Sequence, residues 1–371
     1  MPHTPILIIG AGPAGLAVAG RLREKGLEFV LLEKTDQIAS SWHNHYDRLC
    51  LHTVKELSHL PHLPFPEDFP LYVPRLDLIR YYEHYVAHFD IKPRFNQSVS
   101  EVKKSGDKWE VLIKDGEHWT SDHVVIATGV NHIPNRPEWS GEASFAGQIL
   151  HSHFYKNPQP FLHQKVLVVG MGNTGAEIAL DLAEHDVDVS ISVRTPVNIV
   201  PRDLFGKPVQ TSGKLLEKLP RALGDWIGAQ VRKVVFGDLT KYGLPISKVP
   251  PAVQVRQTGK TPVIDLGTID YIKQGKINVV GDISSFQPEG VKLSSGDDLH
   301  VDAVILATGY RPRLADFIQN IDLELDSQGL PKSSIPANEA FAGMYFVGFD
   351  NYSLGGLLGT IYDESERVVE A

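Results

Sequence analysis

Two glycine-rich turns are the parts of this chain whose spacing most directly predicts chemistry. Residues 6–15 (ILIIGAGPAG) and residues 166–175 (VLVVGMGNTG) each join a short apolar run to a G-x-G-x-x-G pattern. In this pattern the glycines form a tight turn and let the backbone approach a pyrophosphate, which binds at the N-terminus of the following helix. The two copies therefore predict two dinucleotide-binding sites. The residues of the first turn are Gly10, Gly12, Pro13, Ala14 and Gly15, and those of the second are Gly170, Gly172, Asn173, Thr174 and Gly175.

The strand predicted after each turn ends in a charged residue, and the two charges are opposite. The first strand ends at Glu33, followed by Lys34, and the second ends at Arg194, followed by Thr195. A carboxylate accepts hydrogen bonds from a ribose diol and repels a 2′-phosphate, whereas a guanidinium binds a 2′-phosphate through charge-assisted hydrogen bonds. We therefore expect FAD, which lacks a 2′-phosphate, at the first site and NADPH at the second.

A second repeated pattern lies downstream of each glycine turn. Residues 124–129 read VVIATG and residues 304–309 read VILATG, so each turn is followed by an apolar strand that ends in Ala-Thr-Gly. Dinucleotides bind outside the carboxyl ends of parallel strands. We expect both tripeptides to border a nucleotide, and their residues are Ala127, Thr128, Gly129, Ala307, Thr308 and Gly309.

The positions of these motifs predict an α/β fold with two Rossmann-like dinucleotide-binding domains, one for FAD and one for NADPH, each of the three-layer ββα type. We expect the FAD domain to be discontinuous, with residues 1–130 as its first part and residues 310–371 as its second. The NADPH domain then takes residues 131–309, and residues 200–262 are expected to form helices and loops within it.

Local patterns place the elements around the turns. Helices are expected over 13–25 and 174–185, and Asp115-Gly116 predicts a hairpin turn within residues 109–126. Short strands are expected over 277–306. A further helix is expected over 75–89, and its predicted buried face consists of Leu76, Ile79, Val86 and Phe89.

Composition excludes several classes of function. The chain has 371 residues and a formal net charge of −9, so nucleic acid is not an expected partner. Its single cysteine, Cys50, excludes an intramolecular disulfide relay. No apolar run approaches the roughly 18 residues of a membrane span, and no export signal begins the chain. We expect a cytoplasmic protein with no metal site. The oligomeric state stays open, and a homodimer is one possibility.

Between the two glycine turns, residues 145–155 read FAGQILHSHFY, which is F-x-G-x-x-x-H-x-x-x-Y on Phe145, Gly147, His151 and Tyr155. With both turns and the ATGYRP run at 307–312, this motif resembles the signature of class B flavin-containing monooxygenases. The related Baeyer–Villiger type usually carries Trp at the place of Tyr155. The segments YDRLCLHTVK (46–55), FPEDFP (65–70) and GGLLG (355–359) are most similar to the YUCCA-like branch, the indole-3-pyruvate monooxygenases.

The resemblance implies roles for particular residues. It places Trp42 along the flavin, and His52 and Thr53 beside the flavin and the nicotinamide, where animal members carry Asn-Thr. It also implies that the backbone amides after Gly355 meet the flavin pyrimidine ring. The implied FAD contacts beyond those named above are Trp42, His52, Thr53, Val102, Asp350, Gly356, Leu357 and Leu358, and Ala176 and Glu177 continue the helix over the NADP pyrophosphate.

Several of these residues also have ordinary structural interpretations. His52 and Lys55 are the catalytic candidates, but His52 fits a structural histidine and Lys55 fits a surface lysine. His151 fits a residue that orders a domain hinge as well as a proton donor. Asp350 fits a turn, and Cys50 fits a small buried hydrophobic residue.

The resemblance implies a monooxygenase in which NADPH reduces FAD and oxygen adds at flavin C4a. One oxygen atom then enters a small organic substrate, either a 2-keto acid such as indole-3-pyruvate or a soft nitrogen or sulfur nucleophile. Two alternatives remain at this point. The first is a flavoprotein reductase or oxidase that passes electrons from NADPH to a quinone or a protein. The second is a non-catalytic redox sensor that responds to nucleotide binding.

Overall fold

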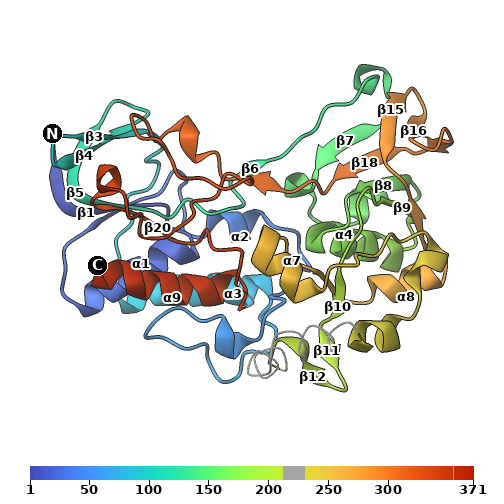
Figure 1. Cartoon of the computed structure of the whole chain (residues 1–371), viewed down its shortest axis with the longest axis horizontal. Helices are drawn as coiled ribbons and strands as arrows, with labels where there is room; N and C mark the ends of the chain where they lie inside the picture. Colours follow the sequence, from blue (N-terminus) through green and yellow to red (C-terminus); the bar gives the residue numbers. More distant parts are fainter. Residues whose placement is uncertain (212–229, 354) are drawn as a thin grey trace. The chain divides into compact units, whose positions relative to one another are not determined.

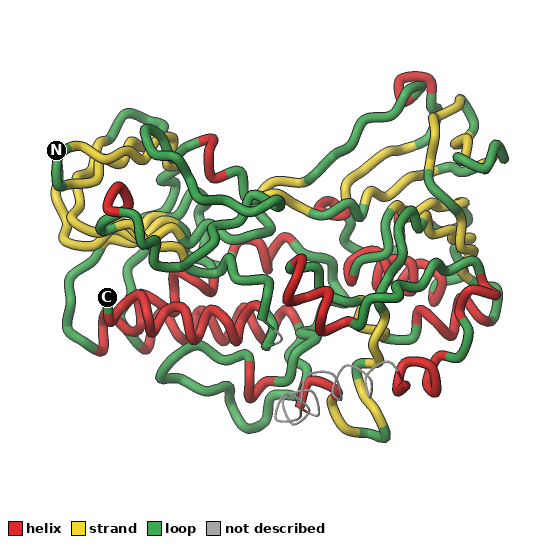
Figure 2. The backbone as a smooth tube through the Cα atoms, in the orientation of Figure 1, coloured by secondary structure: helices red, strands yellow, loops and turns green. Residues whose placement is uncertain are grey.

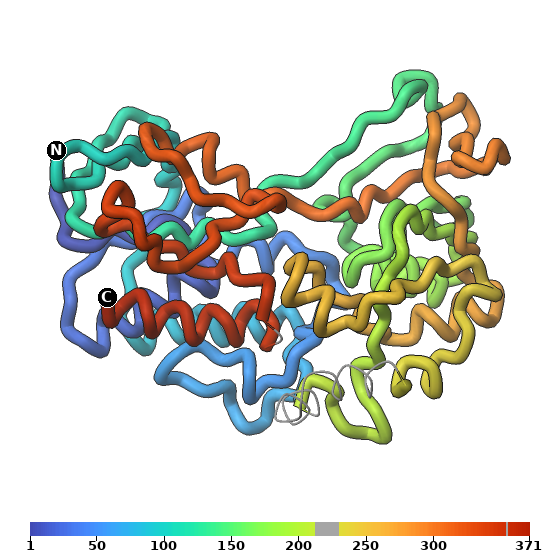
Figure 3. Tube along the Cα trace, in the orientation of Figure 1, coloured from blue at the N-terminus to red at the C-terminus, as the bar shows by residue number. Residues whose placement is uncertain are grey.

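The computed structural model describes residues 1–211, 230–353 and 355–371. The chain divides into two compact units. Unit 1 comprises residues 1–44, 53–133 and 310–371, and unit 2 comprises residues 45–52 and 134–309. The colours of Figure 3 show this discontinuity, because blue, cyan and red segments meet in unit 1 whereas green to orange segments form most of unit 2. Of the predicted helices and loops over 200–262, residues 212–229 lie outside the described residues.

Unit 1 is built on a mixed sheet of six strands with the order β2-β1-β5-β4-β3, in which β20 also pairs with β5. β1 is parallel to β2 and β5, and β5 is parallel to β20 but antiparallel to β4. The nine-residue β5 can hold two partners along one side because its first half pairs with β4 and its second half with β20. The strands are β1 (His3–Ile9), β2 (Val30–Leu32), β3 (Val99–Ser105), β4 (Lys108–Ile113), β5 (His118–Ile126) and β20 (Met344–Phe346).

Side chains of β1 alternate between two apolar layers. Leu7 and Ile9 join a core cluster with Trp109, Val111 and other residues of the antiparallel strands. Ile8 points the other way, because a Cβ added at Gly15 of α1 would lie 3.4 Å from its methyl group. Figure 1 shows α1, α3 and α9 together, and Figure 2 separates these helices from the strands by colour. The helices of unit 1 are α1 (Pro13–Glu24), α2 (Ser40–Asn44), α3 (Arg75–His88) and α9 (Leu357–Glu370).

Unit 2 contains a parallel sheet of five strands with the order β14-β9-β8-β18-β7. A separate antiparallel sheet, β15-β16-β17, follows β14 in the chain. The strands of both sheets are β7 (Gln148–His151), β8 (Lys165–Val169), β9 (Asp188–Ser192), β14 (Ile277–Val280), β15 (Ile283–Gln287), β16 (Gly290–Leu293), β17 (Asp298–His300) and β18 (Ala303–Leu306).

The parallel sheet of unit 2 is covered on both faces. Leu167 of β8 and Val304 of β18 share an apolar cluster with Phe286 and Val291 of the antiparallel sheet. Helices α4 and α8 contact β8, β9 and β14. Strands buried on both faces read as continuous apolar runs, as the sequence of β8 does. The remaining helices are α4 (Asn173–Glu184), α7 (Pro251–Thr258) and α8 (Thr268–Lys273).

Each unit therefore places a parallel sheet between an antiparallel sheet segment and helices, and the predicted ββα class with two Rossmann-like units is confirmed. Short strands complete the structure: β6 (Ile133–Pro134), β10 (Ile199–Pro201), β11 (Asp203–Leu204), β12 (Lys207–Pro208), β13 (Val263–Asp265) and β19 (Tyr310–Arg311). The 3₁₀ helices are Lys55–Leu57, Glu142–Ser144, Ser152–Phe154, Gln159–Phe161, Leu239–Tyr242, Leu314–Asp316 and Glu339–Phe341.

The structure corrects one predicted helix face. α3 occupies the predicted range, but Leu76 is 61% exposed, and the residues it buries are Leu78, Ile79, Tyr81, Tyr82 and Tyr85. The prediction was right for Ile79 and Phe89, which are buried, and wrong for Leu76, because it left the tyrosines out of the buried face. Tyrosine rings bury a large apolar area, and here the Tyr81 hydroxyl donates to the carbonyl oxygen of Leu63 and the Tyr85 hydroxyl to that of Pro61.

Two further observations concern the chain as a whole. The predicted domain ranges assign residues 45–52 to the first domain, whereas the contacts of this segment place it in unit 2. Across the described ranges, none of the helices combines the length and the apolar character that a membrane span requires.

Candidate nucleotide-binding and catalytic residues

The first glycine turn links β1 to α1, and glycine suits each of its three positions for a different structural reason. Gly10 has a φ of 106°, and a Cβ there would lie 2.6 Å from the carbonyl oxygen of Ala127. A Cβ at Gly15 would lie 1.9 Å from the carbonyl oxygen of Gly10. A Cβ at Gly12 would meet no atom within 4 Å, so this position faces open space at the N-terminus of α1. Open space beside free helix amides suits a pyrophosphate.

The second glycine turn, between β8 and α4, repeats this geometry. Gly170 has a φ of 103°, and its Cβ would lie 2.8 Å from the carbonyl oxygen of Ala307. A Cβ at Gly175 would lie 1.9 Å from the carbonyl oxygen of Gly170, and a Cβ at Gly172 would meet nothing within 4 Å. The Ala-Thr-Gly strand end therefore packs against the fingerprint in both units.

The charged residues that follow the two turns differ in their surroundings. Glu33 is 5% exposed, and its carboxylate accepts hydrogen bonds from the backbone amides of Ala11 (2.8 Å) and Thr35 (3.0 Å). Arg194 is exposed, and no described residue pairs with its guanidinium. Lys34 and Thr195, the next residue in each case, are both exposed. The acid is thus tied to the first glycine turn, whereas the arginine is free to bind a phosphate.

The carboxyl end of β5 carries a polar atom without a partner. Thr128 Oγ1 is buried, and no described group forms a hydrogen bond with it. Nearby His132 was not predicted as a site residue. Burial, together with the charge of Lys34, lowers the pKa of His132 to about 4, so the ring is neutral at pH 7. An unsatisfied hydroxyl on a residue that packs against Gly10 of the first turn fits a bound dinucleotide.

The last helix begins at the residues that the resemblance assigns to the flavin ring. α9 starts at Leu357 after Gly356, which has a φ of 79°. Asp350 accepts hydrogen bonds from the Tyr352 amide and the Ser353 hydroxyl, both at 2.8 Å. Asp350 also borders a cavity of about 330 Å³ together with Glu364.

Three further predicted residues of unit 1 have clear structural surroundings. The Lys55 ammonium donates to the carbonyl oxygens of Glu67 and Phe69, both at 2.7 Å, and to that of Pro66 at 3.4 Å. This lysine therefore holds the loop that follows it. Val102 lies in the core, and its amide donates to Phe317 O at 2.6 Å. The partly buried Trp42 accepts a bond from Arg75 at its carbonyl oxygen, and Thr53 shares a 2.7 Å hydrogen bond with Ser58.

The signature residues all lie in unit 2. A Cβ at Gly147 would lie 2.2 Å from the carbonyl oxygen of Asp302, and Phe145 packs on Phe286. His151 Nδ1 accepts a hydrogen bond from the backbone amide of His153 (3.1 Å). Its Nε2 is 3.1 Å from Gly309 O, and burial lowers its pKa, so the ring is neutral with the proton on Nε2.

Tyr155 leads to a group of residues that the sequence analysis did not find. Its hydroxyl donates to Asp181 of α4 at 2.7 Å, and burial together with this bond raises its pKa. Arg48 forms ion pairs with Asp181 (3.2 Å) and Glu184 (2.7 Å). Burial opposes the charge of Arg48, but the hydrogen bond and charge of Glu184, with Asp181, leave its pKa raised. The available signal was the spacing of acids along one face of α4.

Glu177 lies on this same face, although the resemblance places it over the NADP pyrophosphate. It is 3% exposed, and its Oε2 accepts a hydrogen bond from Tyr46 at 2.8 Å and lies 3.1 Å from His52 Nε2. Asn173 is the first residue of α4. Its side-chain Oδ1 accepts a hydrogen bond at 2.7 Å from the backbone amide of Ile264, which lies in β13.

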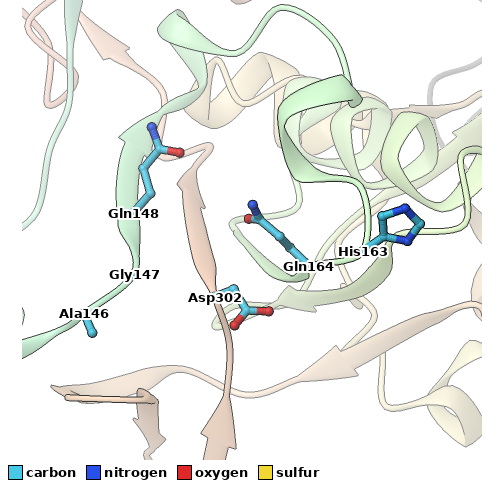
Figure 4. A pocket seen from close by; sticks show the side chains of 6 residues that line it. All are labelled: Ala146, Gly147, Gln148, His163, Gln164 and Asp302. Atoms are coloured by element: carbon cyan, nitrogen blue, oxygen red, sulfur yellow. The ribbon is translucent and has the colours of Figure 1, made fainter.

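A cavity of about 600 Å³ in unit 2 lies away from the glycine turn. It is lined by Ala146, Gly147, Gln148, His163, Gln164 and Asp302 (Figure 4). These residues precede or begin β7, β8 and β18, so the cavity lies at the amino ends of the parallel strands. Dinucleotides bind at the carboxyl ends, and this cavity is therefore not the nucleotide site.

Two observations concern the possible metal ligands and the single thiol. In residues 1–211, 230–353 and 355–371, no three His, Cys, Asp or Glu side chains cluster in a way that could hold a metal ion. The thiol of Cys50 lies 3.6 Å from the carbonyl oxygen of Arg48. The fold and the paired turns define a class of oxidoreductase that holds two dinucleotides, and the open space at Gly12 and Gly172 fits them.

Comparison with known proteins agrees with this class. Residues 7–203 match the family described as pyridine nucleotide-disulphide oxidoreductase. The chain is 39% identical to probable indole-3-pyruvate monooxygenase YUCCA7 of Arabidopsis thaliana, over 94% of this chain and 84% of that protein. It is 38% identical to indole-3-pyruvate monooxygenase YUCCA1 of Oryza sativa subsp. japonica, over 96% and 88%.

Solved structures share the fold. A flavin-containing monooxygenase from Stenotrophomonas maltophilia aligns with a TM-score of 0.75 at 21% identity, covering 100% of this chain and 98% of that one. A bacillithiol disulfide reductase from Staphylococcus aureus aligns with a TM-score of 0.70 at 18% identity, covering 100% and 99%.

The chain belongs to the flavin-containing monooxygenase family, in its YUCCA-like branch. It is an oxidoreductase that uses FAD and NADPH.

Proposed function

We propose that this enzyme converts a 2-keto acid of the arylpyruvate class, such as indole-3-pyruvate, into the acid one carbon shorter. The balanced reaction takes up the 2-keto acid, O₂, NADPH and one proton, and releases the shorter acid, CO₂, NADP⁺ and water. The names of the plant relatives, at 38–39% identity over most of the chain, support this substrate class. The observation that carries the proposal is the pair of complete glycine turns followed by opposite charges, at Glu33 and Arg194, in a chain with one cysteine.

The residues of the two turns have distinct tasks in this proposal. In unit 1 the first turn and Glu33 bind FAD, with Thr128 Oγ1 as a further hydrogen-bonding group. In unit 2 the second turn binds the pyrophosphate of NADPH, and the exposed Arg194 binds its 2′-phosphate. The N-terminus of α9 supplies backbone amides and the positive end of a helix dipole, which stabilise negative charge at the flavin pyrimidine. When bound, FAD supplies the redox chemistry that links hydride transfer from NADPH to activation of O₂.

Electron transfer to a protein disulfide within the chain is excluded, because Cys50 is the only cysteine. The described thiol also contacts a backbone carbonyl rather than a second sulfur. The enzyme therefore needs an acceptor that comes from solution, and O₂ with an organic substrate meets this need. The protein must orient the substrate and exclude water, since stray protons divert the reduced oxygen to H₂O₂.

Labelled oxygen tests the reaction. The FAD-loaded enzyme is incubated with NADPH, indole-3-pyruvate and ¹⁸O₂, and the acid product is analysed by mass spectrometry. We expect one ¹⁸O atom in the new carboxylate and one NADPH consumed per acid formed. Catalase is added in excess, because H₂O₂ released by the enzyme would itself decarboxylate a 2-keto acid in solution.

Compounds that differ from the 2-keto acid in their reacting group test the proposed substrate class. The corresponding aryl-lactate has the same ring and carboxylate but no keto group, so it should give NADPH consumption without a shortened acid. Amines and sulfides test the alternative attack on a soft nucleophile. Product acid without ¹⁸O, or product that disappears when catalase is present, contradicts the proposal and leaves an NADPH oxidase.

A further inference from the structure

The face of α4 that carries Glu177, Asp181 and Glu184 is covered by the segment of residues 45–52. Glu177 and Asp181 are 3% and 5% exposed, although carboxylates are almost never fully buried unless they are paired. Their partners come from this segment and from the signature motif: Tyr46 and His52 meet Glu177, and Arg48 and Tyr155 meet Asp181. All of these residues belong to unit 2.

The two acids have different kinds of partner. Asp181 meets the permanently charged guanidinium of Arg48 at 3.2 Å and the Tyr155 hydroxyl at 2.7 Å. This arrangement anchors the segment. Glu177 instead meets the Tyr46 hydroxyl at 2.8 Å and the His52 imidazole at 3.1 Å, and neither of these described partners carries a permanent charge.

The contact at Glu177 decides which nitrogen of His52 carries a hydrogen. An ionised carboxylate only accepts hydrogen bonds, so Nε2, at 3.1 Å from Oε2, must be the donor. Nδ1 is then the nitrogen left to exchange a proton, and no described residue forms a hydrogen bond with it. The His52 side chain is 17% exposed, so solvent reaches part of the side chain. A carboxylate behind one ring nitrogen with the other nitrogen free is the arrangement that orients a histidine for proton transfer.

The position of this pair in unit 2 places it beside the NADPH turn. Glu177 follows Gly175 by two residues and lies in the first turns of α4, whose N-terminus faces the open space at Gly172. His52 is held against that same helix. A proton carried by His52 is therefore held next to the part of unit 2 that binds the reductant.

We propose that Glu177 is a positioning residue that holds His52 with its proton on Nε2, so that Nδ1 transfers the one proton taken up in each turnover. This inference rests on the proposed function. In that reaction the hydride of NADPH and one proton from solvent become the two hydrogens of the water released. The hydride supplies two electrons to O₂, and cleavage of the bond between the carbonyl carbon and the carboxylate supplies the other two. His52 takes the proton from solvent at Nδ1 and delivers it to the oxygen atom that leaves as water.

The first experiment observes the imidazole directly. The FAD-loaded enzyme is labelled with ¹⁵N-histidine, and the imidazole N–H signals are recorded by ¹H–¹⁵N correlation in water. An imidazole N–H held by a carboxylate exchanges slowly enough to be seen, and loss of one signal in His52→Gln assigns it. We expect this signal in the wild type and in the control Tyr46→Phe, and its loss in Glu177→Met, which keeps the length of the side chain but removes the acceptor.

The second experiment separates positioning from anchoring. Product formed per NADPH, H₂O₂ released and NADP⁺ affinity are measured for Glu177→Met, His52→Gln and Tyr46→Phe. Gln at position 52 can still donate to Glu177 but cannot transfer a proton. We expect about a tenfold loss of product per NADPH, with H₂O₂ replacing it, in both the Glu177 and His52 variants. NADP⁺ affinity and the Tyr46→Phe enzyme should stay within about twofold of the wild type.

Two results would overturn the inference. One is a His52 Nε2–H signal that is absent in the wild type or unchanged in Glu177→Met. The other is Tyr46→Phe losing as much coupling as Glu177→Met, which assigns Glu177 to anchoring alone. If no 2-keto acid is oxygenated at all, the proposed function fails and the proton-transfer step fails with it. The imidazole signal still decides separately whether Glu177 positions His52.

Discussion

The two glycine turns share one backbone geometry, yet their surroundings differ in the way charge is handled. In unit 1, Glu33 is buried and bonded to the amide of Ala11 within the turn itself. In unit 2, Arg194 is exposed and no described residue pairs with it. A buried acid that already has backbone partners is held rigidly, an arrangement that suits a neutral diol. An exposed arginine is suited to a doubly charged phosphate, which must be bound and released in every turnover.

The helices that follow the two turns also differ in what their buried charged residues contact. α1 is held by α9, because the buried Arg21 donates to Ser365 (3.1 Å) and to the carbonyl of Tyr362 (3.1 Å). α4 instead carries its own buried acids, which bind the segment of residues 45–52. The helix after the first turn is thus hydrogen-bonded to the last helix of the chain. The helix after the second turn instead binds a segment that carries the candidate catalytic residue His52.

The largest expected effect comes from adding a methyl group inside either turn. Gly15→Ala and Gly175→Ala each place a Cβ 1.9 Å from a backbone carbonyl oxygen, so the turn must open. We expect the free energy of unfolding to fall by about 3 kcal/mol or more, as overpacking against rigid backbone does. Chemical denaturation followed by circular dichroism measures this loss.

The matched controls are Gly12→Ala and Gly172→Ala, whose Cβ atoms meet nothing within 4 Å. Both variants should fold normally but obstruct the pyrophosphate. Gly12→Ala should be purified without flavin absorbance, whereas Gly172→Ala should keep its flavin and lose NADP⁺ affinity. Loss of flavin from Gly172→Ala would contradict the assignment of FAD to unit 1.

A second test removes the charge that distinguishes the turns. Arg194→Ala should raise KM for NADPH about ten- to a hundredfold, because charge-assisted hydrogen bonds contribute about 1.5–3 kcal/mol. KM for NADH, which has no 2′-phosphate, should change less than twofold. Steady-state kinetics with both nucleotides decides this, and equal effects on the two would remove Arg194 from the phosphate site.

The smallest expected effect concerns Glu364 of α9, which lies behind the first turn. Its carboxyl accepts a hydrogen bond from the Gly348 amide at 2.7 Å, and burial, with the charge of Asp350, raises its pKa to about 7. The folded protein therefore keeps a proton that the unfolded chain releases above its ordinary value of 4.5. Stability from this group is present at low pH and is lost as pH rises through 7.

Glu364→Gln removes this dependence. Between pH 5 and pH 8 the wild type should lose about 1–2 kcal/mol more of its free energy of unfolding than the variant, within the limit of about 3 kcal/mol that a shift of this size allows. The control is Asp363→Asn, an exposed neighbour on the same helix, which should follow the wild type. Parallel curves for wild type and Glu364→Gln in urea titrations would show that Glu364 carries no such proton.

Much of the fold could be predicted from the sequence because the decisive signals are local. The G-x-G-x-x-G turns, the apolar strands before them and the charged residues after them lie within about 25 residues of one another, a distance that one strand-turn-helix-strand unit spans. Gly26, which directly follows the helix predicted over 13–25, has a φ of 67°, the left-handed conformation in which glycine commonly ends a helix. The hairpin turn at Gly116, with a φ of 91°, follows from its dipeptide alone.

Other features needed the tertiary structure because their partners are distant in the chain. The buried face of α3 depends on which side of the helix faces its neighbours, and the aliphatic pattern pointed to the exposed Leu76. Nothing in the sequence around Lys55 indicates that its ammonium donates to three backbone carbonyls, which lie 11–14 residues further on.

By itself, then, the sequence determined two nucleotide turns of opposite charge and the class of chemistry that they allow. Only the tertiary structure decided that residues 45–52 belong with unit 2 and that Glu177 faces His52, 125 residues away in the chain. The physical reason is that backbone turns are specified by neighbouring residues. A buried carboxylate, by contrast, is specified by whichever donors the fold brings to it.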